Sequence, residues 1–118
     1  MQSSISLLAL TVAAAGPLVA ERFITQVGAY PAAGGTAFGV SRTSAKTAGD
    51  LVPVDVLGTA IVETGAAVAL DAPLMVDAQG CVVTLTAGKV GVGRAMAVAT
   101  GAGDRIEVLL TPTAVLAV

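Results

Sequence analysis

The sequence has few of the residue types on which catalytic chemistry usually depends. Among 118 residues it has no His, no Trp, one Cys, six basic and eight acidic side chains. Histidine is the usual proton shuttle near neutral pH, and catalysis needs an acid, base, nucleophile or metal ligand held close to a partner group. We therefore interpret the chain as a packing and assembly protein, and we expect no enzymatic activity and no cofactor.

The single cysteine, Cys81, excludes a disulfide within the chain and a metal site made of several cysteines. It begins the run 81–86, where Cys81, Val83 and Leu85 would share one face of a strand. Because the chain has no His to activate the thiol, we predict a small, buried and unreactive side chain.

Aromatic and basic residues are also scarce. Phe23, Tyr30 and Phe38 are the three aromatic residues, so the core must consist mainly of Val, Leu and Ile. The six Lys and Arg residues are isolated from one another, and the net charge is −2. Neutralising phosphates requires clustered basic side chains, so we do not expect direct contact with nucleic acid.

Small and β-branched apolar residues are what the chain has in excess. Hydrophobic residues make up 55% of the sequence, and the mean hydropathy is +0.89. The length suits one domain. So apolar a composition indicates that part of the surface is buried against other subunits.

The N-terminal segment allows two interpretations. Residues 5–15 are apolar and resemble the core of a secretory signal, but no Lys or Arg precedes them. The run is also shorter than the roughly 20 residues that cross a bilayer, so we expect no membrane partner. We favour an arm, residues 1–17, ahead of a β-rich domain, residues 18–118. As a strand, the arm would be apolar on both faces and would need covering by another subunit; we expect its deletion to leave the domain folded. The predicted partner-contact residues are Ile5, Leu7, Leu8, Leu10 and Val12.

The rest of the chain alternates short strand patterns with Gly and Pro turns. This spacing predicts an all-β fold, a small antiparallel β-barrel or sandwich of short strands with an extended N-terminal arm. Residues 90–99 are compatible with either a strand or a helix. The predicted strands are residues 18–28, 36–42, 51–57, 59–64, 67–70, 74–76, 81–86 and 106–111.

Three groups of residues resemble functional motifs. Residues 88–93 echo a phosphate-binding loop, but Val90 follows Lys89 where Ser or Thr is required, so we predict a bend. The polar run 41–47 is typical of a solvated loop. The five carboxylates Asp50, Asp55, Glu63, Asp71 and Asp77 show no spacing that singles out a catalytic pair. We assign the four aspartates to turns and loops.

The C-terminal half resembles a known family. Residues 80–83 (GCVV), 91–96 (GVGRAM) and 99–110 (ATGAGDRIEVLL) are similar to the end of the tailed-phage head-decoration, or capsid cement, proteins. Residues 39–40 and 55–60 are similar in style to the family's early strands. The resemblance covers about residues 23–112 and contains no catalytic signature.

The resemblance implies a small β-rich protein, made in the host cytoplasm, that binds the outside of a phage capsid, commonly as a trimer. Its partner would be the major capsid protein, whose neighbouring copies it would clamp together. Two other classes stay open: an exported or surface-associated β-domain with a cleaved N-terminal signal, and a small enzyme or sugar-binding domain that uses the scattered carboxylates.

Overall fold

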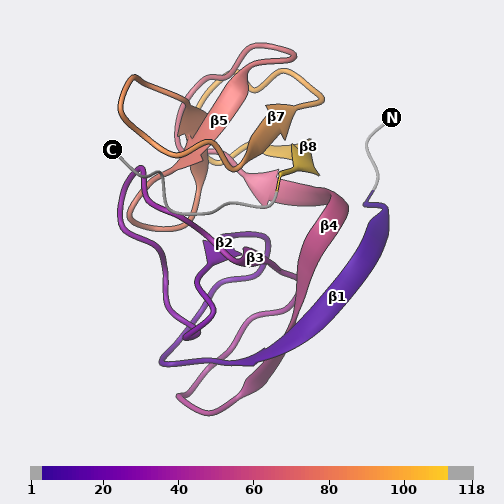
Figure 1. The fold of residues 1–118 in the computed structure, drawn as a ribbon, viewed down its shortest axis with the longest axis vertical. Helices are drawn as coiled ribbons and strands as arrows, with labels where there is room; N and C mark the ends of the chain where they lie inside the picture. The colour runs from indigo at the N-terminus through magenta and orange to yellow at the C-terminus, as the bar shows by residue number, and fades with distance from the viewer. Residues whose placement is uncertain (1–3, 112–118) are drawn as a thin grey trace.

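An eight-stranded sheet makes up the fold in the computed structural model, which describes residues 4–111 (Figure 1). Every strand ladder is antiparallel. The strands are β1 (Ser6–Ala13), β2 (Phe23–Ile24), β3 (Gly39–Ser41), β4 (Leu51–Glu63), β5 (Pro73–Val76), β6 (Val82–Thr84), β7 (Gly93–Ala95) and β8 (Arg105–Leu110).

The 13-residue strand β4 connects the two parts of the sheet. Its first half pairs with β1 on one edge and with β3 on the other, and its second half pairs with β8. Figure 1 shows β1 lying alongside β4, with β5, β7 and β8 grouped near the other end of the molecule. Alternate side chains of β4 face the interior, as the pleat requires: Val52, Val54, Ala60 and Val62 are buried.

These buried side chains belong to two hydrophobic clusters. The larger cluster joins the second half of β4 to β5–β8 and includes Val62, Leu74 and Ile106. The smaller cluster joins the first half of β4 to β1 and the loops near it, and includes Val12 and Val52. The largest fully buried side chains are Ile, Leu, Val and Thr, which confirms the prediction of a core with little aromatic content.

The all-β prediction is confirmed, but its barrel alternative is wrong. The strand order is β2-β3-β4-β8-β7-β5-β6, with β1 added to β4. A barrel needs a complete ladder between the first and last strands of such an order. Within residues 4–111 no ladder joins β2 to β6, which have two and three residues. The sheet is therefore open and folded over its core as in a sandwich.

The predicted strands 51–57 and 59–64 form one strand, so our prediction of a break at Gly58 was wrong. Gly58 has φ of 100°, a conformation that glycine tolerates and that allows the strand to continue. A Cβ atom at this position would lie 2.1 Å from the carbonyl oxygen of Ile5. Gly58 thus allows the start of β1 to approach β4.

The predicted strand 18–28 is reduced to the two residues of β2. Glu21 has φ of 65°, which interrupts the extended backbone before the strand. After it, the N–H of Thr25 donates to the carbonyl of Ala29 and closes a turn. Turn geometry therefore overrides the alternating pattern on both sides.

The ambiguous segment 90–99 contains strand β7 rather than a helix. The predicted strand 67–70 is represented by a single bridge from Val68 to Ala99. The apolar ending, residues 113–118, lies outside the described residues. Within residues 4–111 no helix has the length and apolarity needed to cross a membrane.

We predict that Gly58→Ala destabilises the fold more than Gly49→Ala does. Both glycines have positive φ, at 100° and 91°, but a Cβ at Gly49 would meet nothing within 4 Å. The difference between the two variants therefore isolates the clash with β1. We expect Gly58→Ala to cost about 1–3 kcal/mol, measured by urea unfolding at equilibrium. Equal losses in the two variants would contradict the close approach of β1 and β4.

Candidate docking surface

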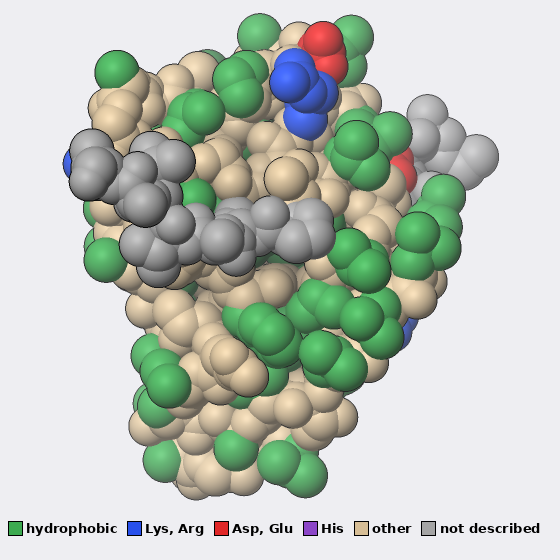
Figure 2. Space-filling model, in the orientation of Figure 1, with side chains coloured by type: hydrophobic (Ala, Val, Ile, Leu, Met, Phe, Trp, Pro, Cys, Tyr) green, Lys and Arg blue, Asp and Glu red, His purple; other side chains and the backbone are tan. Residues whose placement is uncertain are grey.

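Exposed apolar side chains follow strand β1. Leu7 is 76% exposed and Ile5 is 57% exposed, although both are large hydrophobic residues. Figure 2 shows hydrophobic side chains gathered where β1 crosses β4. A contiguous apolar patch on a soluble protein is typical of an interaction site. We define the β1 surface as Ile5, Leu7, Leu8 and Leu10 together with Leu57, which lies opposite Leu8 on β4.

The outer edge of β1 adds unpaired backbone groups to this surface. Among residues 4–111, β1 forms a ladder with β4 alone. Proteins usually protect such an edge with Lys, Pro or an inward-pointing charge. Here no charged residue precedes Glu21 in the sequence. An apolar edge strand without these protections is suited to binding another chain.

Both ends of β1 are fixed to the rest of the chain. At its start, the N–H of Ile5 donates to Thr59 Oγ1 (2.9 Å) and the N–H of Thr59 donates to the carbonyl of Ile5 (2.8 Å). At its end, Val12 and Ala14 are buried in the smaller cluster. The β1 surface is therefore displayed by a strand that is held in place.

The five predicted partner-contact residues thus differ in their surroundings. Ile5, Leu7, Leu8 and Leu10 are exposed, and they stay candidates for contact with another subunit. Val12 is 6% exposed and packs against the chain's own core. Because β1 supplies Val12 to the core, we expect deletion of the arm to destabilise the fold, which revises the expectation from the sequence that the domain stays folded. Point substitutions are therefore the cleaner test. The division into an arm (1–17) and a domain (18–118) stays a prediction.

Sequence reasoning missed Leu57 as part of this surface. We assigned it to a strand whose interior face consists of valines, and Leu57 is on the opposite face. One signal for Leu57 was available in the sequence. Alternation predicts a solvent-facing side chain at this position, yet the residue is large and apolar.

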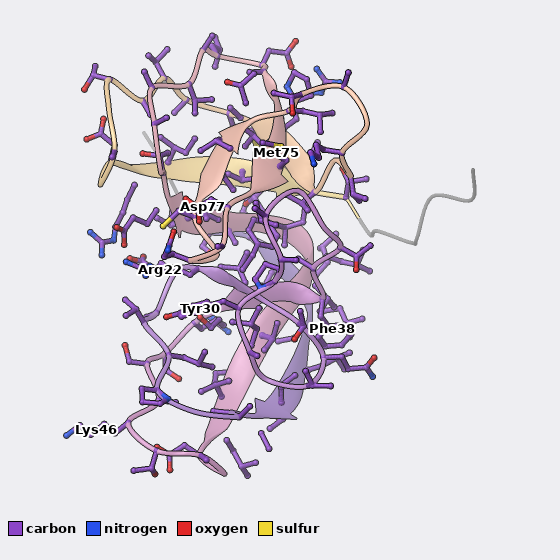
Figure 3. The ribbon with its side chains drawn as sticks, turned by 90° about the vertical axis from the view of Figure 1, so that its left-hand side faces the viewer. Arg22, Tyr30, Phe38, Lys46, Met75 and Asp77 are labelled. Carbon is purple, nitrogen blue, oxygen red and sulfur yellow. The ribbon has the colours of Figure 1, made fainter. Side chains whose placement is uncertain are left out.

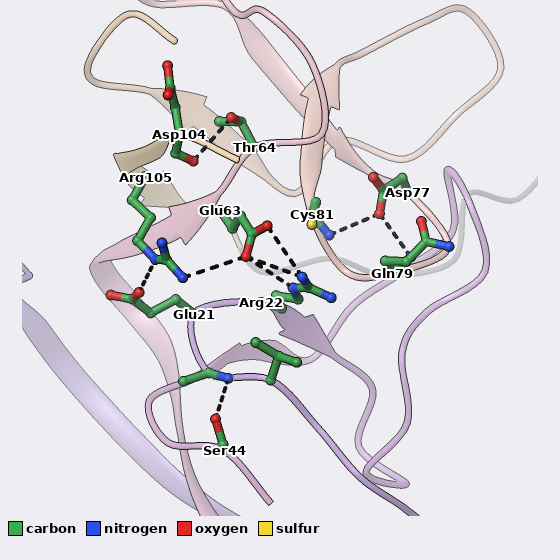
Figure 4. A network of polar contacts seen from close by, with 12 residues as sticks. Glu21, Arg22, Ser44, Glu63, Thr64, Asp77, Gln79, Cys81, Asp104 and Arg105 are labelled. Atoms are coloured by element: carbon green, nitrogen blue, oxygen red, sulfur yellow. Dashed lines mark hydrogen bonds and ion pairs between the residues drawn. The ribbon is translucent and has the colours of Figure 1, made fainter. Parts of the chain in front are cut away.

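A network of ion pairs lies at the junction of the two parts of the sheet (Figure 4). Glu63, at the end of β4, pairs with Arg22 (3.3 Å) and with Arg105 (3.7 Å). Arg105 Nε also donates to a carboxylate oxygen of Glu21. The Arg22 guanidinium lies 6.0 Å from the centre of the Tyr30 ring. The network ties the segment before β2 to β4 and β8, and its geometry fits a structural role.

Lys46 lies away from the ion-pair network. Figure 3 shows its side chain projecting at one end of the molecule, while Arg22 is near the middle. The expectation that the chain makes no direct contact with nucleic acid stays a prediction.

Cys81 is buried, as predicted. Burial, and then the negative charge of Asp77, raise the pKa of its thiol. The side chain therefore stays a neutral thiol at neutral pH, which is the less nucleophilic form.

Asp50 and Asp77 close turns through their side chains, as expected. Asp50 accepts hydrogen bonds from the N–H groups of Lys46 and Thr47, which lower the pKa of its carboxyl. Asp77 accepts from the N–H groups of Gln79 and Cys81.

The other three carboxylates differ from one another. Asp71 lies in a turn, as predicted, where it has φ of 67° and forms an exposed pair with Arg94. Glu63 belongs to the network described above. Asp55 is not in a turn or a loop; it is buried within β4, so our prediction for it was wrong. Among residues 4–111, no three His, Cys, Asp or Glu side chains are grouped so that they could hold a metal ion.

The prediction of a bend at residues 88–93 holds, and the prediction of a solvated loop at residues 41–47 holds only in part, because Ser41 and Ala45 are buried. Residues 88–92 lie between strands, and the N–H of Lys89 donates to the carbonyl of Thr86 in a turn. The polar run 41–47 starts in β3 and continues as an irregular segment that ends at the Asp50 turn.

Comparisons with known proteins agree with this arrangement. Residues 1–110 match the family model described as phage cement protein. The fold is similar to that of the head fiber gp8.5 N base of bacteriophage phi29, with a TM-score of 0.71 and 19% identity. That match covers 88% of this chain and 93% of the phage phi29 chain. Among curated proteins none matches this sequence.

We predict that Glu63→Gln destabilises the fold by about 1–3 kcal/mol, because it removes the charge shared by two arginines at a partly buried site. The control is Asp71→Asn, since the Asp71 side chain is 77% exposed and its pair with Arg94 is screened by solvent. We expect the control to change the free energy of unfolding by less than about 0.5 kcal/mol. Similar urea midpoints for both variants would show that the network does not join the two parts of the sheet.

Proposed function

Since the chain belongs to the phage cement protein family, we propose that it binds the major capsid protein on a phage head and stabilises the contacts between neighbouring copies. Proteins of this family are structural components of the virion and lie on the outer surface of the capsid. The proposal concerns the partner and the mode of binding. The observation that carries it is the β1 surface, an exposed apolar strand with an unpaired edge.

The physical properties of the β1 surface suit this role. Large apolar side chains at the centre of an interface supply much of the free energy of binding. An edge strand adds backbone hydrogen bonds when it extends the sheet of a partner. A symmetric shell offers many equivalent sites, so a linked oligomer gains avidity from moderate contacts. We propose a trimer as that oligomer, as the family resemblance implies.

The alternative of an exported domain is less compatible with the fold. Cleavage after Ala15 would remove β1, and the fully buried Val52 and Val54 would lose the strand that pairs with them. Exposing such side chains costs roughly 1.5–3 kcal/mol each. The scattered carboxylates serve turns and ion pairs, which gives no support to a catalytic role.

We predict that the double variant Ile5→Ser, Leu7→Ser weakens binding to capsids by about tenfold or more per copy. Both side chains are largely exposed in the free protein, so the loss would come from the interface and not from the core. Binding is measured by co-sedimentation with capsids of the same phage that lack the protein.

A matched control is Leu70→Ser, Val98→Ser, because both residues are 61% exposed and lie outside the β1 surface. We expect the control to bind as the unaltered protein does, and both double variants to keep the same urea midpoint. Full occupancy by the Ile5, Leu7 variant would overturn the assignment of this surface.

A further inference from the structure

A cavity of about 180 Å³ lies beside the β1 surface. Ser4, the residue before Ile5, is on its lining together with Ile61 of β4. The polar side chains that line it are those of Ser4, Glu21, Ser41, Arg42 and Asp55. The cavity therefore combines charged groups with direct continuity to the proposed interface.

Asp55 is a buried carboxylate in this cavity whose hydrogen-bonding needs are not met by the fold. Its side chain is only 3% exposed, although it is a carboxylate in the middle of β4. Its Oδ1 atom is fully buried and has no hydrogen-bond partner among the described residues. Its Oδ2 atom lies 3.6 Å from Arg42 Nε, an ion pair without a short hydrogen bond.

The other polar groups of the cavity are already engaged. Ser41 Oγ donates to the carbonyls of Val19 and Arg22. Ser4 Oγ donates to the carbonyl of Thr59, and Glu21 accepts from Arg105. Asp55 Oδ1 is thus the buried acceptor in this group that has no partner among the described residues, and Asp55 lines a cavity large enough for the head of another side chain.

A buried carboxylate without donors is expensive, because it loses its hydration and gains little in return. Arg42 compensates only part of this cost, since its side chain is 50% exposed and shared with solvent. A cationic donor compensates more than a neutral one, because charge-assisted hydrogen bonds are about twice as strong. An occupant with a positive charge and N–H groups fits the site best.

We propose that this cavity receives a basic side chain, Lys or Arg, of the capsid subunit on which the protein docks, and that Asp55 is its acceptor. This inference rests on the proposed function. The apolar β1 surface supplies the contact area, and the Asp55 cavity supplies a polar anchor that fixes the register of docking. Docking would give the carboxylate the donor that it lacks in the free protein.

The test compares Asp55→Asn with Asp71→Asn in co-sedimentation with the same capsids. Both substitutions remove one negative charge, but Asp71 is exposed and belongs neither to the β1 surface nor to the cavity lining. We expect Asp55→Asn to weaken capsid binding by about tenfold or more, and to leave the urea midpoint unchanged or higher, because a buried unpaired charge is removed. Asp71→Asn should bind normally.

A second variant decides the matter if Asp55→Asn fails to fold. Ser4 is exposed at the mouth of the cavity, so Ser4→Trp should block entry while the core stays intact. Its control is Gln79→Trp at another exposed position. We expect Ser4→Trp to bind capsids about tenfold more weakly or worse, and Gln79→Trp to bind normally.

The outcomes separate this inference from the proposed function. If the unaltered protein binds capsids and the folded Asp55 and Ser4 variants bind equally well, Asp55 contacts only water or Arg42. This result would overturn the assignment of the Asp55 cavity and leave the proposed function standing. If Asp55→Asn changes the solution mass of the free protein but not capsid binding, the donor belongs to a second copy, which also overturns it. Failure of the unaltered protein to bind would overturn both proposals.

Discussion

The antiparallel pairing along β4 is the interaction on which the rest of the structure depends. Its interior face contributes Val52 and Val54 to one hydrophobic cluster and Ala60 and Val62 to the other. The same strand holds β1 and β3 on its first half and β8 on its second. The two clusters therefore depend on the same strand. The ion pairs around Glu63 join the end of this strand to the neighbouring segments.

This arrangement explains why an apolar strand can be displayed without harming the fold. β1 buries Val12 in the smaller cluster while Leu7 and its apolar neighbours on β1 remain in contact with solvent. Gly58 lets the start of β1 lie close against β4, and Asp55 of β4 sits at a cavity beside it. One stretch of β4 thus supports both the apolar surface and the polar anchor that we propose for docking on the capsid.

The sequence was informative where local pattern decides structure. Alternation located β3, β5, β6 and β8, and composition indicated a core poor in aromatic residues. Prediction from the sequence failed where tertiary contacts determine the structure. Local rules predict a break at Gly58, but β4 continues past this residue because it pairs with β1 before it and with β8 after it. Burial of Asp55 could not be predicted from local pattern, because it depends on pairing of β1 and β3 with β4 on the two sides of this residue. The exposed leucines were predicted as contacts with another subunit, and this stays a prediction.

The most direct test of the account is a cryo-electron microscopy map of capsids decorated with the protein, at a resolution that traces its strands. We predict that β1 and the Asp55 cavity face the major capsid protein, and that Leu7 and Leu10 contact this protein. A map in which β1 faces solvent, while another part of the sheet touches the shell, would contradict the assignment of the docking surface.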